Sequence, residues 1–310
     1  WPLFTIFITW SGATFIRFVQ ENKTKKLIKN QFEHYLAPSI VKLLQKDPGK
    51  LQLGGDTREL SILFSDLRDF TTLSEQFKSK PQELTDLINK YLTPMTGCVI
   101  DNNGTVDKFI GDALMAFWNA PVDDEDHRVN TINCALEMFE LLKQLNVELK
   151  EKDIELRMGI GVNTGTVVVG NMGSNQRFDY TCLGDAVNLS ARLESQTKSY
   201  KVGLLVGEQT KLGIEDKFNF IELDEIAVKG KTEGVKIYTI IDSSKYVIEH
   251  ATFLDAYVNQ RWDSAIEQAN INKDLIPTIA SYYDMMIDRI EILKTSNNEN
   301  WDAIFRSTSK

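Results

Sequence analysis

The stretch Thr105–Trp118, TVDKFIGDALMAFW, carries the clearest structural signal in the sequence. Two apolar segments of strand length, Thr105–Ile110 and Ala113–Trp118, flank the dipeptide Gly111-Asp112. Two strand-like segments joined by a two-residue connection of this kind predict a β-hairpin. The hairpin presents Asp112 at its tip, where a rigid backbone holds a polar side chain in one place.

Strands and helices alternate on both sides of this hairpin. Short apolar runs predict strands over 60–65, 156–162 and 167–169, the last two separated by the turn-like Asn163-Thr164-Gly165. Apolar residues at helical spacing predict helices over 82–98, 129–145 and 186–199. The order strand, helix, hairpin, helix, strand predicts an α+β fold with helices on one face of a sheet.

The first part of the chain has a different character. Residues 1–16 carry no charge, and five basic side chains follow against the single acidic Glu21: Arg17, Lys23, Lys25, Lys26 and Lys29. Positive charge after an apolar run is typical of the cytoplasmic flank of a membrane-spanning helix. We therefore expect residues 1–18 to be the end of a transmembrane helix and 19–55 a cytoplasmic linker, although a full crossing needs roughly 20 apolar residues. A buried or interfacial helix is the alternative.

The other end of the chain is predicted to be helical. After Ile241, apolar residues keep helical spacing, which predicts a short helical appendage over 242–310. The segment is too short for an established array of helical repeats, which needs about three units.

Composition excludes several classes of protein. The chain has 310 residues, with 35 basic and 44 acidic side chains and a net charge of −9. Because phosphate neutralisation supplies most non-specific affinity for nucleic acid, we expect no nucleic acid partner. The three cysteines, Cys98, Cys134 and Cys182, form no CxxC pair, which argues against a disulfide framework or a cysteine zinc site.

Two carboxylates are placed where they could act together. Asp66 follows the predicted strand 60–65, and Asp112 lies at the hairpin tip. If the two strand ends are neighbours, the repulsion between the carboxylates is relieved by a shared proton or by a hard divalent cation with oxygen ligands. The alternative is that both are ordinary turn aspartates, since aspartate is common in turns.

Three longer segments decide between these alternatives. They are FSDLRDFT at 64–71, KFIGD at 108–112 and DYTCLGDAVNLSARLE at 179–194. Together, and in this order, they resemble the three signatures of class III adenylate and guanylate cyclases, over roughly residues 56–241. The resemblance implies a ferredoxin-like βαββαβ catalytic domain over 56–241, between the N-terminal helices and the C-terminal appendage.

The resemblance also implies the metal-binding and catalytic residues. Asp66 and Asp112 match the two metal-binding aspartates, and the carbonyl of Leu67 matches an added ligand. The implied cofactors are two divalent cations, Mg²⁺ or Mn²⁺. Asn188 matches the residue that orients the ribose, and Arg192 matches the arginine that stabilises the transition state.

The substrate-binding residues follow in the same way. Lys108 and Thr181 match the two purine-reading positions, where guanylate cyclases of the family carry an acidic residue and a cysteine. Phe70 and Thr71, at the end of the first signature, are implied substrate contacts. Lys229 resembles the lysine that contacts the terminal phosphates of the nucleotide.

The implied activity is conversion of ATP to 3′,5′-cyclic AMP and pyrophosphate at a homodimer interface. One subunit of such a dimer supplies the metal aspartates, and the other supplies the purine, ribose and arginine positions. A guanylate cyclase and a catalytically silent, nucleotide-sensing relay are the alternatives.

The flanks of the catalytic domain also resemble known cyclases, and two positions inside the domain depart from the family's pattern. The N-terminal flank is similar to bacterial cyclases attached to an extracytoplasmic CHASE-type sensor, so we expect a bacterial inner-membrane location with the catalytic domain in the cytoplasm. Asp69 lies where glycine is common, and is expected either to be a solvated turn carboxylate or to add negative charge beside the metals. Thr166 replaces an arginine that binds phosphate in some members.

Overall fold

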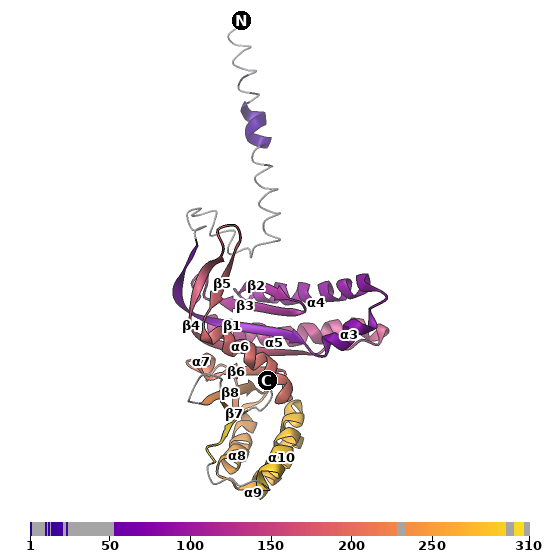
Figure 1. Cartoon of the computed structure of the whole chain (residues 1–310), viewed down its shortest axis with the longest axis vertical. Coiled ribbons are helices and arrows are strands. Elements are labelled where there is room, and N and C mark those ends of the chain that lie inside the picture. Colours follow the sequence, from indigo (N-terminus) through magenta and orange to yellow (C-terminus); the bar gives the residue numbers. More distant parts are fainter. Residues whose placement is uncertain are drawn as a thin grey trace. The chain divides into compact units, whose positions relative to one another are not determined.

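The computed structural model describes residues 1, 10, 12, 14–20, 23, 53–227, 234–295 and 301–306. The chain divides into two compact units, Trp1–Leu53 and Gly54–Lys310. In the first unit the described residues 14–20 are helical. All elements discussed below belong to the second unit (Figure 1).

A single sheet organises the second unit. The chain runs through β1 (Gly54–Leu67), α3 (Phe70–Gln76), α4 (Pro81–Asp101), β2 (Thr105–Ile110), β3 (Ala113–Trp118), α5 (His127–Leu149) and β4 (Met158–Gly173). Adjacent strands in the sheet follow the order β2-β3-β1-β4-β6-β8-β7-β9, and β5 pairs with β4. The first four of these strands, with α4 and α5, form the βαββαβ arrangement. The α+β prediction and the predicted hairpin are confirmed.

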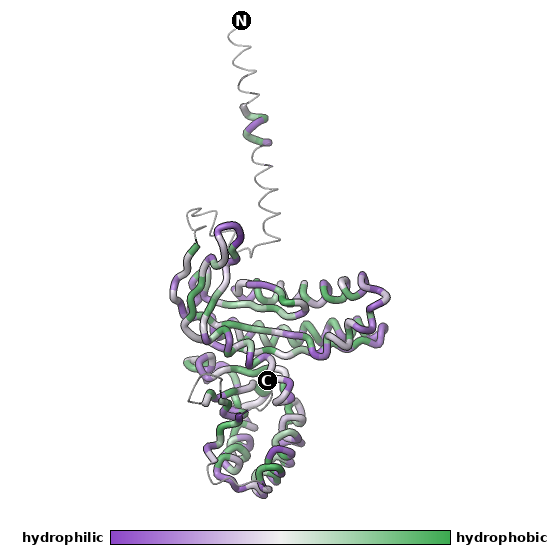
Figure 2. The backbone as a smooth tube through the Cα atoms, viewed as in Figure 1, coloured by the Kyte–Doolittle hydropathy of each residue, from purple (hydrophilic) through white to green (hydrophobic). Residues whose placement is uncertain are grey.

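The remaining elements extend the sheet and add helices. They are β5 (Phe178–Leu183), α6 (Asp185–Ser199), β6 (Leu204–Gly207), α7 (Glu208–Lys211), β7 (Phe220–Ala227) and β8 (Gly234–Ile240), and then α8 (Val247–Val258), α9 (Trp262–Leu275), α10 (Ala280–Lys294) and β9 (Ile304–Phe305). Hydrophobic residues concentrate along the central strands, while the connection between β4 and β5 is hydrophilic (Figure 2).

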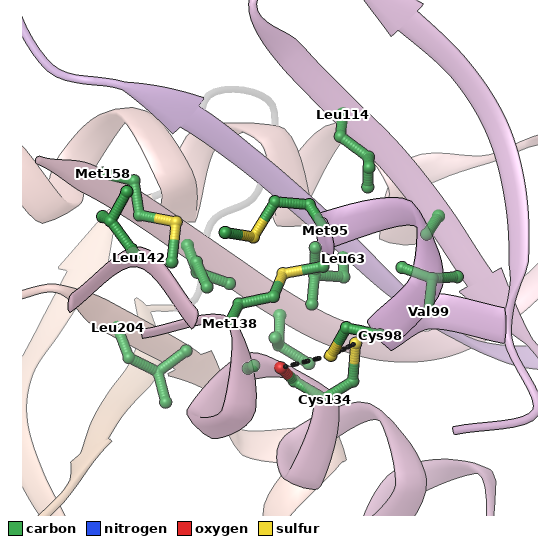
Figure 3. Packing of buried hydrophobic residues seen from close by; sticks show 14 of the residues in the cluster. Leu63, Met95, Cys98, Val99, Leu114, Cys134, Met138, Leu142, Met158 and Leu204 are labelled. Carbon is green, nitrogen blue, oxygen red and sulfur yellow. Dashed lines mark hydrogen bonds between the residues drawn. The ribbon is translucent and has the colours of Figure 1, made fainter. Parts of the chain in front are cut away.

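From Leu60 to Leu67, strand β1 is buried or partly buried on both faces, which determines where the helices pack. Leu63 belongs to the cluster formed with α4 and α5, in which the Sγ atoms of Cys98 and Cys134 lie 3.1 Å apart (Figure 3). Ile62, which points the other way, packs with Ala186 from α6. The expectation that helices cover one face of the sheet is therefore wrong, because both faces of β1 are apolar and each needs a cover.

The predicted turn at 163–165 is also wrong. β4 continues through it and pairs with the whole length of β1, from Gly54↔Asn171 to Leu67↔Met158. The polar side chains that resemble a turn are hydrogen-bonded inside the fold: Asn163 donates to the carbonyl of Ala186, and Thr164 Oγ1 is 2.7 Å from Ser61 Oγ. Because these hydrogen bonds satisfy their polar side chains, Asn163 and Thr164 can lie in a buried strand.

Helix α6 lies against β4 without an intervening side chain at one point. A Cβ on Gly161 would lie 2.1 Å from the backbone nitrogen of Glu194 and 2.4 Å from the carbonyl oxygen of Ser190. Ser190 Oγ donates to the carbonyls of Ile62 and Gly161 at the same contact. The glycine thus sets the distance between helix and sheet.

Gly161→Ala is therefore expected to destabilise the protein by about 3 kcal/mol, the upper end of the cost of overpacking, because backbone atoms cannot move aside as a side chain can. Gly97→Ala is the matched control. Its Cβ would meet nothing within 4 Å in the middle of α4, so it is expected to stabilise by about 0.5–1 kcal/mol. Urea unfolding measures both, and equal midpoints for Gly161→Ala and wild type would contradict the prediction.

The C-terminal helices pack on the far end of the sheet. Phe253 of α8 and Tyr282 of α10 share a hydrophobic cluster with Leu223 of β7 and Ile237 of β8. Asp224, also in β7, is buried and accepts hydrogen bonds from Tyr200 and Arg289. The predicted helical appendage contains a short strand as well, since β9 pairs in parallel with β7.

The membrane prediction is contradicted. Among the residues that the structure describes, no helix combines the length and the apolar character needed to cross a bilayer. The expected inner-membrane location, and with it the expected bilayer contact, is therefore withdrawn. Most of the expected transmembrane helix at 1–18 (residues 2–9, 11 and 13) lies outside the described residues. Residues 2–9 and 24–52, which include most of the expected linker, lie outside the described residues.

Candidate active site

Asp66 and Asp112 are brought together by the sheet. Ser65 of β1 is opposite Leu114 of β3, so the end of β1 lies beside the hairpin tip that carries Asp112. Burial and a direct interaction with the Asp66 carboxyl together raise the pKa of Asp112 to about 6, while the backbone N–H of Leu67 opposes the rise. Asp112 Oδ2 is buried without a hydrogen-bond partner.

This arrangement fits a divalent cation. Two carboxylates, one with a buried oxygen that lacks a partner, offer hard oxygen donors at one point. Within the described ranges no group of three or more His, Cys, Asp or Glu side chains forms a complete metal cage. Mg²⁺ is commonly held by one or two carboxylates with phosphates completing its shell, so a pair is sufficient for a cation that arrives with a nucleotide.

The repulsion between the two carboxyl groups makes a stability prediction. A carboxyl whose pKa rises on folding from 3.8 to about 6 contributes stability at low pH that is lost as the pH rises through about 6. Asp112→Asn removes that loss, so at pH 7.5 the metal-free variant is expected to be more stable than wild type. Half-exposure screens the repulsion, which limits the gain to about 1 kcal/mol.

Urea unfolding in the presence of a chelator measures this difference. The gain is expected at pH 7.5 and should be small at pH 4.5, where wild-type Asp112 is protonated. A variant no more stable than wild type at pH 7.5 would contradict the assigned repulsion.

A buried ion pair lies next to the carboxylates, and the sequence did not indicate it. Arg68 Nη1 is 3.4 Å from Glu194 Oε1, and both side chains are largely buried. Burial, with smaller contributions from the charges of Asp66 and Asp112, raises the pKa of Glu194 to about 7, while Arg68 opposes the rise. The positive charge of Arg68 interacts with the carboxylates of Glu194, Asp66 and Asp69. Arg68 lies inside the first quoted signature and Glu194 inside the third. This position in the signatures was the signal by which the sequence could have indicated the two residues.

Asp69 does not add uncompensated charge to this site. Its φ of 56° is the left-handed conformation that glycine adopts readily, which explains why glycine is common at this position in the family. Its carboxylate is half exposed and lies 3.3 Å from Arg157 Nη2 and 3.2 Å from Lys198 Nζ. Of the two expectations for Asp69, the solvated turn carboxylate is correct.

The two purine-reading candidates are joined by a residue that the sequence analysis missed. Thr181 of β5 donates to Asp107 Oδ2 at 2.5 Å, and Lys108 Nζ lies 3.2 Å from Asp107 Oδ1. Asp107 is at a bulge of β2, between Val106 and Lys108. Burial raises the pKa of Asp107, whereas Thr181 and Lys108 lower it. The contact thus gathers Lys108 and Thr181, 73 positions apart in the chain, at one place.

The other candidates lie at separate places. Asn188 and Arg192 are on the exposed face of α6, whereas Leu189 and Leu193 of the same helix are buried. Phe70 and Thr71 begin α3, with Phe70 packed against the core and Thr71 exposed. Leu67 is buried at the end of β1. Lys229 lies outside the described residues.

Comparison with known proteins agrees with this fold. The Adenylate and Guanylate cyclase catalytic domain family matches residues 55–242, more than half of the chain. The chain belongs to this family.

Individual relatives include both kinds of cyclase. The chain is 34% identical over 185 residues to Adenylate cyclase 1 of Rhizobium meliloti, covering 59% of this chain and 28% of that protein. The structure of the adenylyl cyclase CyaB from P. aeruginosa has a TM-score of 0.57 at 35% identity, covering 62% of this chain and 97% of that one. The guanylyl cyclase Cya2 has a TM-score of 0.55 at 34% identity, covering 61% and 94%. The chain thus spans less than a third of the Rhizobium relative's length.

Proposed function

We propose that this chain is an adenylate cyclase that converts ATP to 3′,5′-cyclic AMP and pyrophosphate. One observation carries the proposal: the interacting carboxyl groups of Asp66 and Asp112, with a buried oxygen that lacks a partner. Two divalent cations bound by these groups and the Leu67 carbonyl would lower the pKa of the ribose 3′-hydroxyl and neutralise charge on the attacking and leaving oxygens.

The remaining residues bind and orient the nucleotide. Asn188 holds the ribose so that its 3′-oxygen points at the α-phosphorus, and Arg192 donates hydrogen bonds to phosphate oxygens whose charge grows in the transition state. Phe70 and Thr71 contact the substrate beside the metal site, and Lys229 contacts the terminal phosphates. The ribose hydroxyl is the nucleophile, so no side-chain nucleophile is required.

We also propose that two copies of the chain complete each other's sites. Asn188 and Arg192 face solvent, while the carboxylates lie at the end of β1. A twofold homodimer places the α6 face of one copy against the carboxylates of the other and creates two equal sites. Apolar side chains next to the purine-reading positions support such an interface, with Phe109 and Leu183 48% and 60% exposed.

ATP is the proposed substrate because of Lys108 and Thr181. A lysine ammonium can only donate, and adenine N1 accepts, whereas guanine N1 carries a proton. Thr181 has a lone pair for the 6-amino group of adenine. The adenylyl and guanylyl cyclase structures are about equally similar to this chain, so the proposal depends on these two side chains.

The domain division remains part of the proposal. We assign the catalytic domain to 56–241 and a C-terminal extension to 242–310. The hydrophobic cluster that the extension shares with β7 and β8 supports a stabilising role for it at that end of the sheet.

An assay of ATP and GTP across a protein dilution series tests the proposal. With Mn²⁺ or Mg²⁺, we expect cyclic AMP from ATP to exceed cyclic GMP from GTP, and specific activity to fall on dilution as dimers dissociate. Equal or faster turnover of GTP would make the chain a guanylate cyclase. If neither cyclic AMP nor cyclic GMP forms at high protein concentration, the silent, nucleotide-sensing relay is favoured.

A further inference from the structure

Asp107 occupies an unusual position for a carboxylate. Its side chain is fully buried, although it lies in β2 beside the half-exposed Lys108. Burying a charge is costly unless it is paired and hydrogen-bonded. The side chains that meet these conditions are the Thr181 hydroxyl and the Lys108 ammonium, and the backbone of Cys182 adds a further hydrogen bond. The two side chains are the ones proposed to read the base.

The hydrogen bond from Thr181 has a direct chemical consequence. A threonine hydroxyl has one proton to donate and two lone pairs that accept. An ionised carboxylate has no proton and can only accept. In the structure the Thr181 hydroxyl is the donor and Asp107 Oδ2 the acceptor. Burial raises the pKa of Asp107, and the ammonium 3.2 Å away opposes that rise by favouring the ionised form. The single proton of Thr181 is therefore committed to Asp107 Oδ2, and the face that Thr181 turns to a base is an acceptor.

We propose that Asp107 is a positioning residue that fixes the Thr181 hydroxyl as a hydrogen-bond acceptor and thereby selects adenine over guanine. The inference rests on the proposed function, since it assumes that a purine nucleotide binds at Lys108 and Thr181. Without Asp107, a hydroxyl that rotates freely accepts from the amino group of adenine or donates to the O6 of guanine equally well.

The resulting pattern matches only one base. Lys108 donates and Thr181 accepts, which complements N1 and the 6-amino group of adenine. On guanine, N1–H faces the ammonium and O6 faces the threonine lone pair, so both contacts are mismatched. Buried polar groups left unpaired in this way are the strongest source of substrate discrimination.

Asp107→Asn tests the inference with little change of shape. The asparagine carbonyl turns toward Lys108, and its amide donates to Thr181, which frees the threonine proton for the base. We expect the ratio of kcat/KM for ATP to that for GTP to fall at least about tenfold, mainly through a higher KM for ATP, because the base is remote from the reacting atoms. Asp86→Asn, the same change at an exposed position of α4, is expected to leave the ratio unchanged.

Three results would overturn the inference. The first is an Asp107→Asn ratio equal to that of wild type. The second is an equal loss of kcat/KM with both nucleotides in a protein that still unfolds cooperatively, which indicates a structural role alone. Asp107→Glu keeps a carboxylate that can only accept hydrogen bonds. The third result is therefore an ATP:GTP ratio for Asp107→Glu that is as low as the ratio for Asp107→Asn.

A measurement on the wild-type chain covers the case in which the variant does not fold. Competitive binding is compared for ATP, purine riboside triphosphate, which lacks the 6-amino group, and inosine triphosphate, which carries O6 and N1–H. An acceptor at Thr181 predicts affinities in that descending order, and equal affinity for ATP and inosine triphosphate would contradict it. Binding in this order without cyclic nucleotide formation would refute the proposed activity and leave the inference standing. Binding of none of the three would refute both.

Discussion

Asp66→Ala is expected to lower cyclic AMP formation by at least about 10³-fold, because it removes one of the two carboxylates that hold the cations and with them the charge stabilisation of the transition state. The fold should survive, since the change also removes a group that repels Asp112. The loss is therefore expected in kcat, with cooperative unfolding preserved.

Steady-state assays with Mn²⁺ and ATP, paired with urea unfolding, measure both quantities. Asp86→Ala, at an exposed site on α4, is the control and should keep wild-type turnover. An Asp66→Ala protein with wild-type kcat would show that this carboxylate pair is not the metal site.

Arg192→Ala is expected to lower kcat by about 10²–10³-fold with little change in KM, because a preorganised donor that acts on charge developing in the transition state is lost. The side chain is on the exposed face of α6, so truncation leaves the core intact. Lys90, exposed on α4, gives the control Lys90→Ala, which should keep wild-type kcat. A higher KM at unchanged kcat would assign Arg192 to ground-state binding instead.

The two variants together test the homodimer. A mixed dimer of Asp66→Ala and Arg192→Ala subunits has one site with both defects and one site with neither. Subunit exchange in an equal mixture should therefore restore about one quarter of wild-type activity, since half of the dimers are mixed and each has one intact site. A mixture as inactive as its components would show that Asp66 and Arg192 act within one subunit.

The sequence was sufficient to predict the elements with regular periodicity. The hairpin at 105–118 has the predicted strand bounds, and α4 and α5 extend the predicted helices by a few residues at each end. The local sequence pattern failed to predict the structure where contacts with distant residues satisfy the hydrogen bonds of polar side chains. Asn163 and Thr164 look like a turn, but their partners in α6 and β1 are far away in the sequence.

The same limit explains which site residues were missed. Asp66 and Asp112 could be found because each ends a strand in a recognisable motif. Asp107 could not, because an aspartate within a strand gives no signal that it is buried against a threonine 74 residues later. Arg68 and Glu194 are separated by 126 residues, and the ion pair between them depends on the packing of α6 on the sheet.

The close contact of α6 with β4 limits how such an enzyme can be controlled. At Gly161 the helix backbone touches the strand, and Ser190 binds it to two strands at once. A close-packed contact of this kind has no slack for sliding or rolling. In the proposed homodimer, an effector that tunes the rate would leave α6 fixed on its own sheet and rotate one protomer against the other, so that Arg192 of one protomer approaches or leaves the carboxylates of its partner.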